Sequence, residues 1–207
     1  MKDGGRRAFL AVLLAGLGLL VVLYGRRSID EQMTFDRQYP RVNETLYLTL
    51  DGEDVVTFDG TGELYSKDIA SLLKGANLSK DAVTDIIIGE GITEIGYDAF
   101  DGYDALRAIK LGDNVTRVAA GGLKNCPALE YLYYPRDLKD VGLDFLYECK
   151  DCRIVTAGRA SELPEFTNVR IKKRVIEKVD SLEALQVAAG ETRLPVSVSK
   201  WWKRDRT

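Results

Sequence analysis

Apolar and polar residues recur with a period of 23 along the middle of the chain. Three windows of that length align without a gap and a fourth begins, at residues 83–105, 106–128, 129–151 and 152–158. Self-similarity at a period of roughly 20 to 50 residues is typical of repeat proteins, in which each unit buries its apolar face against its neighbours. We therefore predict a solenoid of short coils over residues 83–158.

Each coil is predicted to begin with a short strand whose side chains alternate between two faces. Two columns form the inward face: Ile86, Ile109, Leu132 and Val155, then Ile88, Leu111, Tyr134 and Ala157. The positions on the other face form one outward row: Asp85, Ile87, Ala108, Lys110, Tyr131 and Tyr133. Solenoids commonly bind through such a surface, and Tyr is favoured at interfaces because it brings a large rigid ring with a polar tip. We predict that this row is exposed and contacts the partner.

The remainder of each coil holds a turn and further apolar columns. The turn column Gly91, Asn114 and Asp137 contains the three residue types that best tolerate positive φ. The apolar columns are Ile92, Val115 and Leu138; Ile95, Val118 and Val141; and Phe100, Leu123 and Leu146. Because one coil cannot bury them alone, stacked coils must bury them together. The fold class predicted is a mostly β solenoid of leucine-rich-type repeats.

The segment GITEIGYDAF at residues 91–100 resembles the BspA-like leucine-rich repeats of bacterial surface proteins. DGTGEL at 59–64 and DIIIGEG at 85–91 are similar to the segment commonly placed before those repeats, so the resemblance spans residues 57–158. The later coils depart from the pattern, since Gly121-Gly122-Leu123 stands where the first coil has Asp98-Ala99-Phe100. The resemblance implies binding or adhesion at the cell surface, to a protein or a glycan, and implies no catalytic residue.

Residues 44–82 are predicted to form an N-terminal cap. Two β-prone runs at 45–50 and 55–58, each followed by a glycine turn, indicate an antiparallel meander, and apolar residues at 69, 72 and 73 indicate a short helix. The acidic, glycine-rich stretch at 51–63 could be a calcium loop, but it lacks the EF-hand spacing and is interpreted as turn chemistry.

Residues 159–207 are predicted to be a small α+β C-terminal cap, because the last coil needs its open face covered. The pattern indicates strand-like residues at 168–179 and a helix at 181–189, with Ser181 as its cap and Gly190 as its stop. This region holds 11 basic and 7 acidic residues, and Trp201 and Trp202 lie among the basic ones. The alternative for this end is contact with an anionic membrane surface.

Residues 8–24 carry no charge and are flanked by basic residues. As a helix they would span about 25 Å, near the lower limit for a bilayer core of about 30 Å. The alternatives are a cleaved signal peptide and a buried soluble helix, but LYGRR at 23–27 is a poor context for signal cleavage. We predict a single-pass anchor within residues 1–27, a linker at 28–43, and an extracytoplasmic location for residues 28–207.

The chemistry available to the chain is narrow because it contains no histidine, which excludes Ser-His, Cys-His and His-metal sites. The net charge of -3 argues against nucleic-acid binding. Cys149 and Cys152 form a C-x-x-C, but both fall in apolar columns of the repeat and are interpreted as core residues, with a Cys126–Cys149 bridge conceivable in an oxidising compartment. The first coil has six carboxylates and no basic residue: Asp85, Glu90, Glu94, Asp98, Asp101 and Asp104. They could attract cations, although a solvated surface is the simpler interpretation.

Together these features predict a protein that is not an enzyme and carries no cofactor or metal. The predicted function is that of a membrane-anchored, cell-surface leucine-rich repeat protein that binds a protein or glycan partner. The alternative is a membrane-bound regulatory or assembly scaffold that recognises another subunit of the same cell.

Overall fold

The computed structural model describes residues 45–51, 55–163, 174–190, 198 and 201. The chain divides into compact units at residues 1–39 and 40–207, and all described residues belong to the second. In the part of the chain that is described, no helix is both long and apolar enough to cross a membrane. The predicted anchor at 8–24 and the linker at 28–43 lie outside that part.

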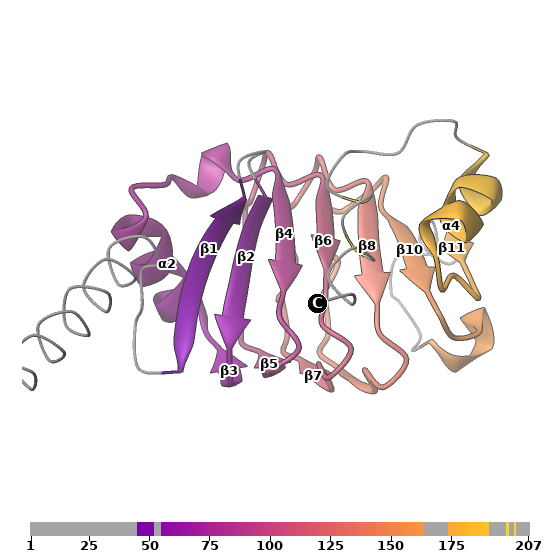
Figure 1. The fold of residues 1–207 in the computed structure, drawn as a ribbon, viewed down its shortest axis with the longest axis horizontal. Coiled ribbons are helices and arrows are strands. Elements are labelled where there is room, and N and C mark those ends of the chain that lie inside the picture. The colour runs from indigo at the N-terminus through magenta and orange to yellow at the C-terminus, as the bar shows by residue number, and fades with distance from the viewer. Residues whose placement is uncertain (1–44, 52–54, 164–173, 191–197, 199–200, 202–207) are drawn as a thin grey trace, which may run out of the picture. The chain divides into compact units, whose positions relative to one another are not determined.

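Among the described residues, the larger sheet has seven strands in the order β1-β2-β4-β6-β8-β10-β11. Their bounds are Leu46–Asp51 (β1), Val55–Gly60 (β2), Asp85–Ile88 (β4), Ala108–Lys110 (β6), Tyr131–Tyr134 (β8), Arg153–Thr156 (β10) and Val175–Ile176 (β11). β1 pairs with β2 antiparallel, and every later pair of neighbours is parallel. The strands lie side by side in chain order (Figure 1), as expected when each coil adds one strand.

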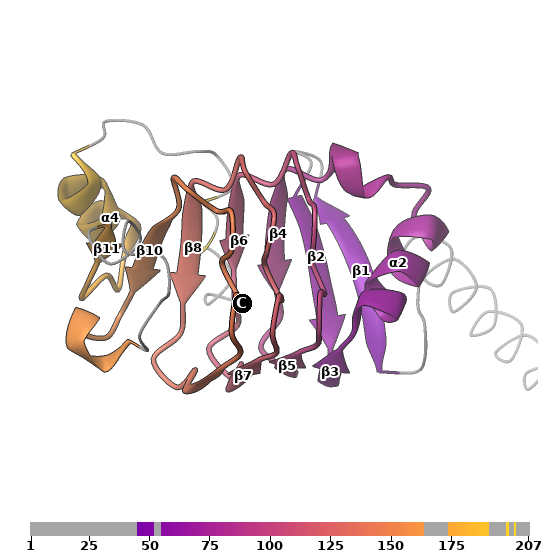
Figure 2. The ribbon, with the colours of Figure 1, turned by 180° about the vertical axis from the view of Figure 1, so that it is seen from behind.

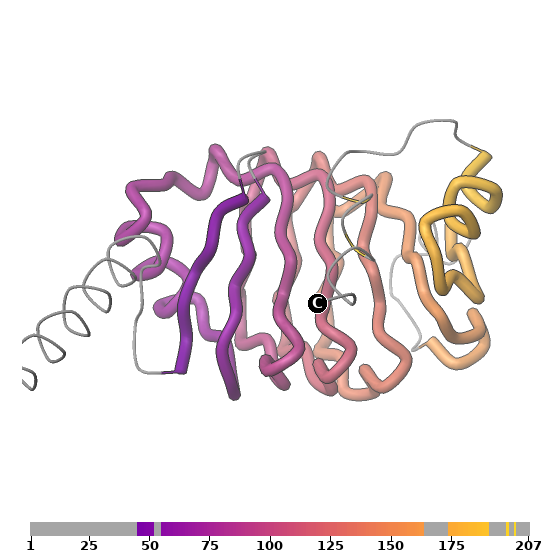
Figure 3. The backbone as a smooth tube through the Cα atoms, in the orientation of Figure 1, coloured from indigo at the N-terminus to yellow at the C-terminus, as the bar shows by residue number. Residues whose placement is uncertain are grey.

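The smaller sheet has four parallel strands in the order β3-β5-β7-β9. Their bounds are Gly62–Leu64 (β3), Ile92–Ile95 (β5), Arg117–Val118 (β7) and Asp140–Val141 (β9). In the view from behind, the returning chain of each coil passes in front of the larger sheet (Figure 2), and the backbone tube shows the same winding path (Figure 3). The predicted mostly β repeat fold is therefore confirmed.

The segment that precedes the repeats is itself part of the solenoid. Its first two strands form the predicted antiparallel hairpin, but β2 then pairs in parallel with β4, and β3 pairs with β5. Residues 55–64 thus make an additional coil rather than the continuation of a meander. The predicted helix is α2 (Ser66–Gly75), which buries Ile69, Leu72 and Leu73, and a 3-10 turn, η1 (Lys80–Ala82), leads into β4.

The main core lies between the two sheets and is lined by the predicted inward columns. The members from the first three coils are at most 2% exposed: Ile86, Ile109, Leu132, Ile88, Leu111 and Tyr134. Burying one large aliphatic side chain contributes about 1.5–3 kcal/mol relative to leaving it in water. These columns were predicted correctly, because alternation along a strand and a fixed repeat period together identify one face.

The fourth coil departs from the predicted columns by one residue. Ile154, not Val155, lies beside Leu132 in the parallel pair of β8 and β10, and Val155 lies beside Tyr133. A shift of one residue moves every side chain of a strand to the opposite face of its sheet. The assignment of Val155 and Ala157 to the inward columns was therefore wrong.

The physical reason for this shift lies in the backbone hydrogen bonds. At the start of β8, the amides of Glu130 and Tyr131 both donate to the carbonyl oxygen of Arg107, at 2.8 and 3.1 Å. Two amides sharing one acceptor leave an extra residue in the strand, as in a β-bulge. In β10 the second of the equivalent amides, that of Ile154, instead donates to the carbonyl oxygen of Arg174 at 3.2 Å. The extra residue is lost there.

Positive φ angles also fall in columns other than the predicted one. Gly91, Asn114 and Asp137 are not in the left-handed region. Two other columns are, each with a spacing of 23 residues. They are Asp98, Gly121 and Asp144, and Gly102, Asn125 and Glu148. Gly91 is needed for close packing instead, since a Cβ there would lie 1.9 Å from the carbonyl oxygen of Gly60. The prediction failed because glycine serves both purposes.

The carboxylates of the first coil pair with basic residues of the second. Three such pairs are Glu90 with Lys110 at 3.6 Å, Glu94 with Arg117 at 2.5 Å and Asp98 with Lys124 at 2.9 Å. The hydrogen bond from Lys124 to Asp98 also raises the pKa of Lys124. Ion pairs between coils therefore account for much of this acidic cluster.

Candidate functional site

The six residues of the predicted binding row lie together on the face of the larger sheet opposite the main core, here called the outer face. Asp85 lies beside Ala108, which lies beside Tyr131, and Ile87, Lys110 and Tyr133 follow in the same register. Val155, shifted onto this side, extends the row to β10. The sequence therefore identified the row, apart from Val155.

The expectation that this row is exposed was wrong. Ile87, Lys110 and Tyr133 are only 6–8% exposed, and Ala108 and Tyr131 are at most 1% exposed. All of these except Lys110 belong to a second apolar cluster whose other members include Val179, Leu185, Val198 and Trp201. The chain's own C-terminal region covers the face that was expected to meet a partner.

We call the covering part, α4 (Leu182–Ala189) with Val198 and Trp201, the C-terminal cover. α4 has the predicted caps: the Ser181 hydroxyl accepts from the Ala184 amide at 3.1 Å, and Gly190 takes a left-handed φ of 67°. Leu185 is fully buried, whereas Val187 is 83% exposed. The apolar side of α4 therefore packs within this cluster and its other side faces solvent.

An aromatic contact joins the C-terminal cover to the outer face. The rings of Trp201 and Tyr133 lie 6.0 Å apart at an interplanar angle of 68°, an edge-to-face arrangement. Such a pair contributes about 0.5–1.5 kcal/mol beyond the burial of its area. Trp201, at 1% exposed, is among the largest fully buried side chains of the described residues. Its role is packing against the sheet, as the cap interpretation expected.

Polar groups are embedded in the outer face among these rings. The Lys110 ammonium lies 5.6 Å from the centroid of the Tyr133 ring, and the Tyr133 hydroxyl donates to Asp113 at 3.1 Å. Arg153 donates to the Tyr131 hydroxyl at 2.7 Å, with its guanidinium 5.4 Å from that ring's centroid. Cations over partly desolvated rings contribute about 0.5–2 kcal/mol each. The outer face is thus both aromatic and charged.

Asp85 carries a buried carboxylate oxygen that no donor among the described residues satisfies. Its Oδ2 accepts from the Thr84 hydroxyl at 2.7 Å, whereas its Oδ1 is buried without a hydrogen-bond partner. An unsatisfied buried acceptor costs about 1–3 kcal/mol, and more when it is charged. This residue lies in the first coil of the predicted row.

The three cysteines lie in the main core as predicted, and all are free thiols. Burial raises the pKa of Cys152, and the hydrogen bond with Cys149, followed by burial, raises that of Cys126. Neutral buried thiols are neither nucleophiles nor metal ligands. Among the described residues, no group of His, Cys, Asp and Glu side chains is arranged to hold a metal ion.

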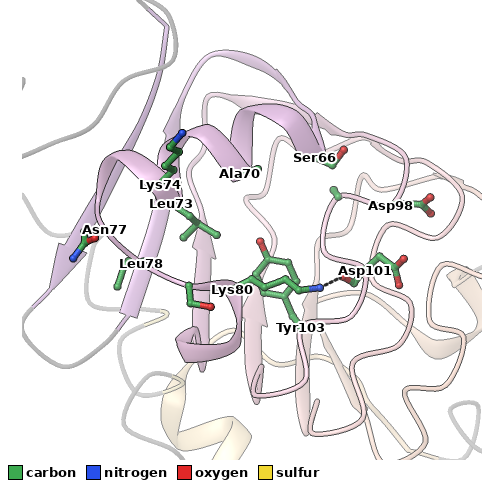
Figure 4. Close-up of a pocket in the computed structure, with 12 residues that line it drawn as sticks. Ser66, Ala70, Leu73, Lys74, Asn77, Leu78, Lys80, Asp98, Asp101 and Tyr103 are labelled. Carbon is green, nitrogen blue, oxygen red and sulfur yellow. Dashed lines mark hydrogen bonds between the residues drawn. The ribbon is translucent and has the colours of Figure 1, made fainter.

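A separate pocket of about 640 Å³ lies between α2 and the first repeat coil (Figure 4). Lys80 reaches across it, donating to the Asp101 carbonyl oxygen at 3.4 Å and lying 5.9 Å from the centroid of the Tyr103 ring. The carboxylates of Asp98 and Asp101 already pair with Lys124. Lys80, Asp98 and Asp101 thus already have partners, so the outer face is the stronger candidate.

A family comparison identifies the repeats. The model described as BspA type leucine rich repeat region matches residues 76–192 in six copies, which is more than half of the chain. The chain belongs to the BspA-type leucine-rich repeat family. This confirms the resemblance stated from the sequence, and the match continues past the last predicted coil, over the residues of β11 and α4.

Two solved structures are similar to this BspA-type chain. A leucine-rich repeat protein from Eubacterium ventriosum is 15% identical with a TM-score of 0.38, over 56% of this chain and 42% of its own. A leucine rich cell surface protein from Faecalibacterium prausnitzii is 15% identical with a TM-score of 0.34, over 66% of this chain and 31% of its own. The chain thus spans less than half the length of either. No curated protein matched it.

Proposed function

We propose that this protein is a non-enzymatic binding module, anchored in the membrane by residues 8–24, which recognises a protein partner outside the cytoplasm. Membership of the BspA-type family and the uncharged N-terminal segment support this proposal. The binding surface in this proposal is the outer face of the larger sheet. The previously predicted residues Asp85, Ile87, Ala108, Lys110, Tyr131 and Tyr133 form most of it.

The observation that carries the proposal is the contrast between the two faces of the larger sheet. The inward columns are almost entirely aliphatic, whereas the outer face presents Tyr131 and Tyr133 together with Lys110 and Asp85. Protein interfaces are enriched in aromatic side chains and Arg, whereas a core strand needs only apolar volume. Tyr131 and Tyr133, with Arg153 bound to the Tyr131 hydroxyl, are the part of the outer face that is typical of a recognition surface. A protein is favoured over a glycan because the face is mainly apolar.

Site-specific photocrosslinking in cells tests this surface. A benzophenone amino acid replaces Tyr133 in one full-length variant and Tyr97, which is 63% exposed and follows β5, in the control. Both changes exchange one aromatic residue for another. We expect adducts with another protein from position 133 and not from position 97. Adducts from position 97 alone would contradict the choice of face.

The alternative, a scaffold that recognises a subunit inside the same cell, differs in the side of the membrane. Protease added to intact cells should cleave residues 28–207 if they are extracytoplasmic. Cleavage that occurs only after lysis would favour the intracellular scaffold. The crosslinked partner, identified from position 133, would provide a second criterion.

A further inference from the structure

The C-terminal region attaches to the sheet in two different ways. Residues 174–179 extend the sheet through backbone hydrogen bonds: Ile154 donates to Arg174 at 3.2 Å, and Val179 donates to Thr156 at 3.0 Å. This part is an additional coil of the solenoid. The C-terminal cover, in contrast, contributes the side chains of Leu185, Val198 and Trp201 to the cluster on the outer face.

Near the end of the first part, Lys178 takes a left-handed φ of 60°. Positive φ is uncommon outside glycine, asparagine and aspartate, so contacts of the neighbouring residues must hold Lys178 in this conformation. Lys178 also donates its amide to the Gly158 carbonyl oxygen at 3.1 Å. The backbone pairing of this part ends at Val179, before α4 begins, so separation of the cover would break none of the β10–β11 hydrogen bonds.

One polar atom of the outer face, on Asp85 between the cluster members Val55 and Ala108, is left unsatisfied. Asp85 Oδ1 is buried and has no donor, although the outer face already contains the cationic side chain of Lys110. A buried polar group without a partner favours any state that supplies one. A protein partner carrying an Arg, Lys or amide donor opposite Asp85 would gain this hydrogen bond, which the cover does not provide.

We propose that the C-terminal cover occupies in cis the surface with which the repeat sheet binds its partner. The partner segment replaces Trp201 with an aromatic side chain of its own against Tyr133 and brings a hydrogen-bond donor to Asp85. The inference rests on the proposed function and adds its regulation: binding requires the cover to open. A covered fraction of about 90–99% weakens apparent binding roughly 10- to 100-fold.

The first test measures hydrogen exchange on the unmodified full-length protein in detergent. An independently opening cover should lose amide protection in α4 at least about tenfold faster than β6 and β8 do, because local opening requires less free energy than global unfolding. Equal protection of α4 and β8 would overturn the proposal, since the cover would then be an integral part of the core.

The second test uses a defined probe, a fluorescent peptide with the sequence of residues 180–207. The hosts are the full-length protein, its Trp201→Ala variant and its Val187→Ala variant, a control in the same region at an exposed position. We expect Trp201→Ala to bind the peptide at least about tenfold more tightly than the other two hosts, because its cover is open more often. A peptide carrying Trp201→Ala should not bind. Equal or absent peptide binding in all hosts would overturn the proposal.

The outcomes separate this inference from the proposed function. Equal crosslinking of a partner at position 133 with and without Trp201→Ala would refute the cover and leave the binding function intact. A cover that opens, with no partner captured from position 133, would refute the proposed binding function and leave the cover intact. Retained exchange protection in β8 of the Trp201→Ala variant shows that the host is folded.

Discussion

Leu132 provides the sharpest test of the assignment of the two faces. It is 0% exposed and lies between Ile109 of the preceding coil and Ile154 of the next. Leu→Ala in a core costs about 2–5 kcal/mol, from lost transfer free energy and from the cavity that remains. Because coils pack on both sides of this residue, the cavity cannot collapse easily, and we expect a loss in the upper half of that range.

The matched control is Leu143→Ala, the same substitution at a site in the same coil that is 76% exposed. Surface changes of this kind alter stability by about 0.5 kcal/mol or less. Urea unfolding of residues 40–207, which form one compact unit, measures both variants. Comparable losses in the two variants would refute the assignment of Leu132 to the inward face of a stacked solenoid.

Three further predictions concern the thiols, the ion pairs and the cover. Burial raises the pKa of Cys152, so the thiol is deprotonated in the unfolded chain at a lower pH than in the folded protein. The free energy of unfolding should therefore fall above about pH 8.5, by up to about 1.4 kcal/mol per pH unit. In Cys152→Ala the urea midpoint should decline less steeply with pH than in the unchanged protein. Arg117 contacts Glu94 and Asp140 of the neighbouring coils at a partly exposed site, so Arg117→Ala should lower the free energy of unfolding by less than about 1 kcal/mol. The Debye length differs about threefold between 50 mM and 500 mM salt. An equal loss of stability at the two salt concentrations would show that the ion pairs contribute nothing. Ser181→Ala removes the cap of α4, worth about 0.5–2 kcal/mol, and should speed amide exchange in α4 while leaving β8 unchanged; unchanged exchange in α4 would contradict the capping role.

Much of the fold can be predicted from the sequence because each structural position of the repeat occurs in several coils, and the residue types found there can be compared. The inward columns through Ile86 and Ile88 were predictable, since three coils place apolar residues there at a constant interval. The helices α2 and α4 were predictable from local spacing and from capping residues such as Ser181. The burial of the cysteines followed from their columns, which were apolar in other coils.

Other features depended on contacts that no local pattern records. The shift at Ile154 arises from how successive amides share an acceptor on the neighbouring strand, which adds or removes one residue without a visible change in alternation. The role of Gly91 arises from the approach of the Gly60 carbonyl in the preceding coil. Both are interactions between coils, and their residue types fit more than one local conformation.

The row from Asp85 to Tyr133 has one property that the sequence determines and another that only the tertiary structure decides. Its existence as one face was determined by the sequence alone, because alternation along a strand and a period of 23 bring these residues into register. Its burial was decided by tertiary structure, because Leu185, Val198 and Trp201 come from a later region with no repeat pattern to indicate its target. A row of Tyr, Ala and Lys can meet water, a partner or the chain's own C-terminal cover, and packing in three dimensions selects the third.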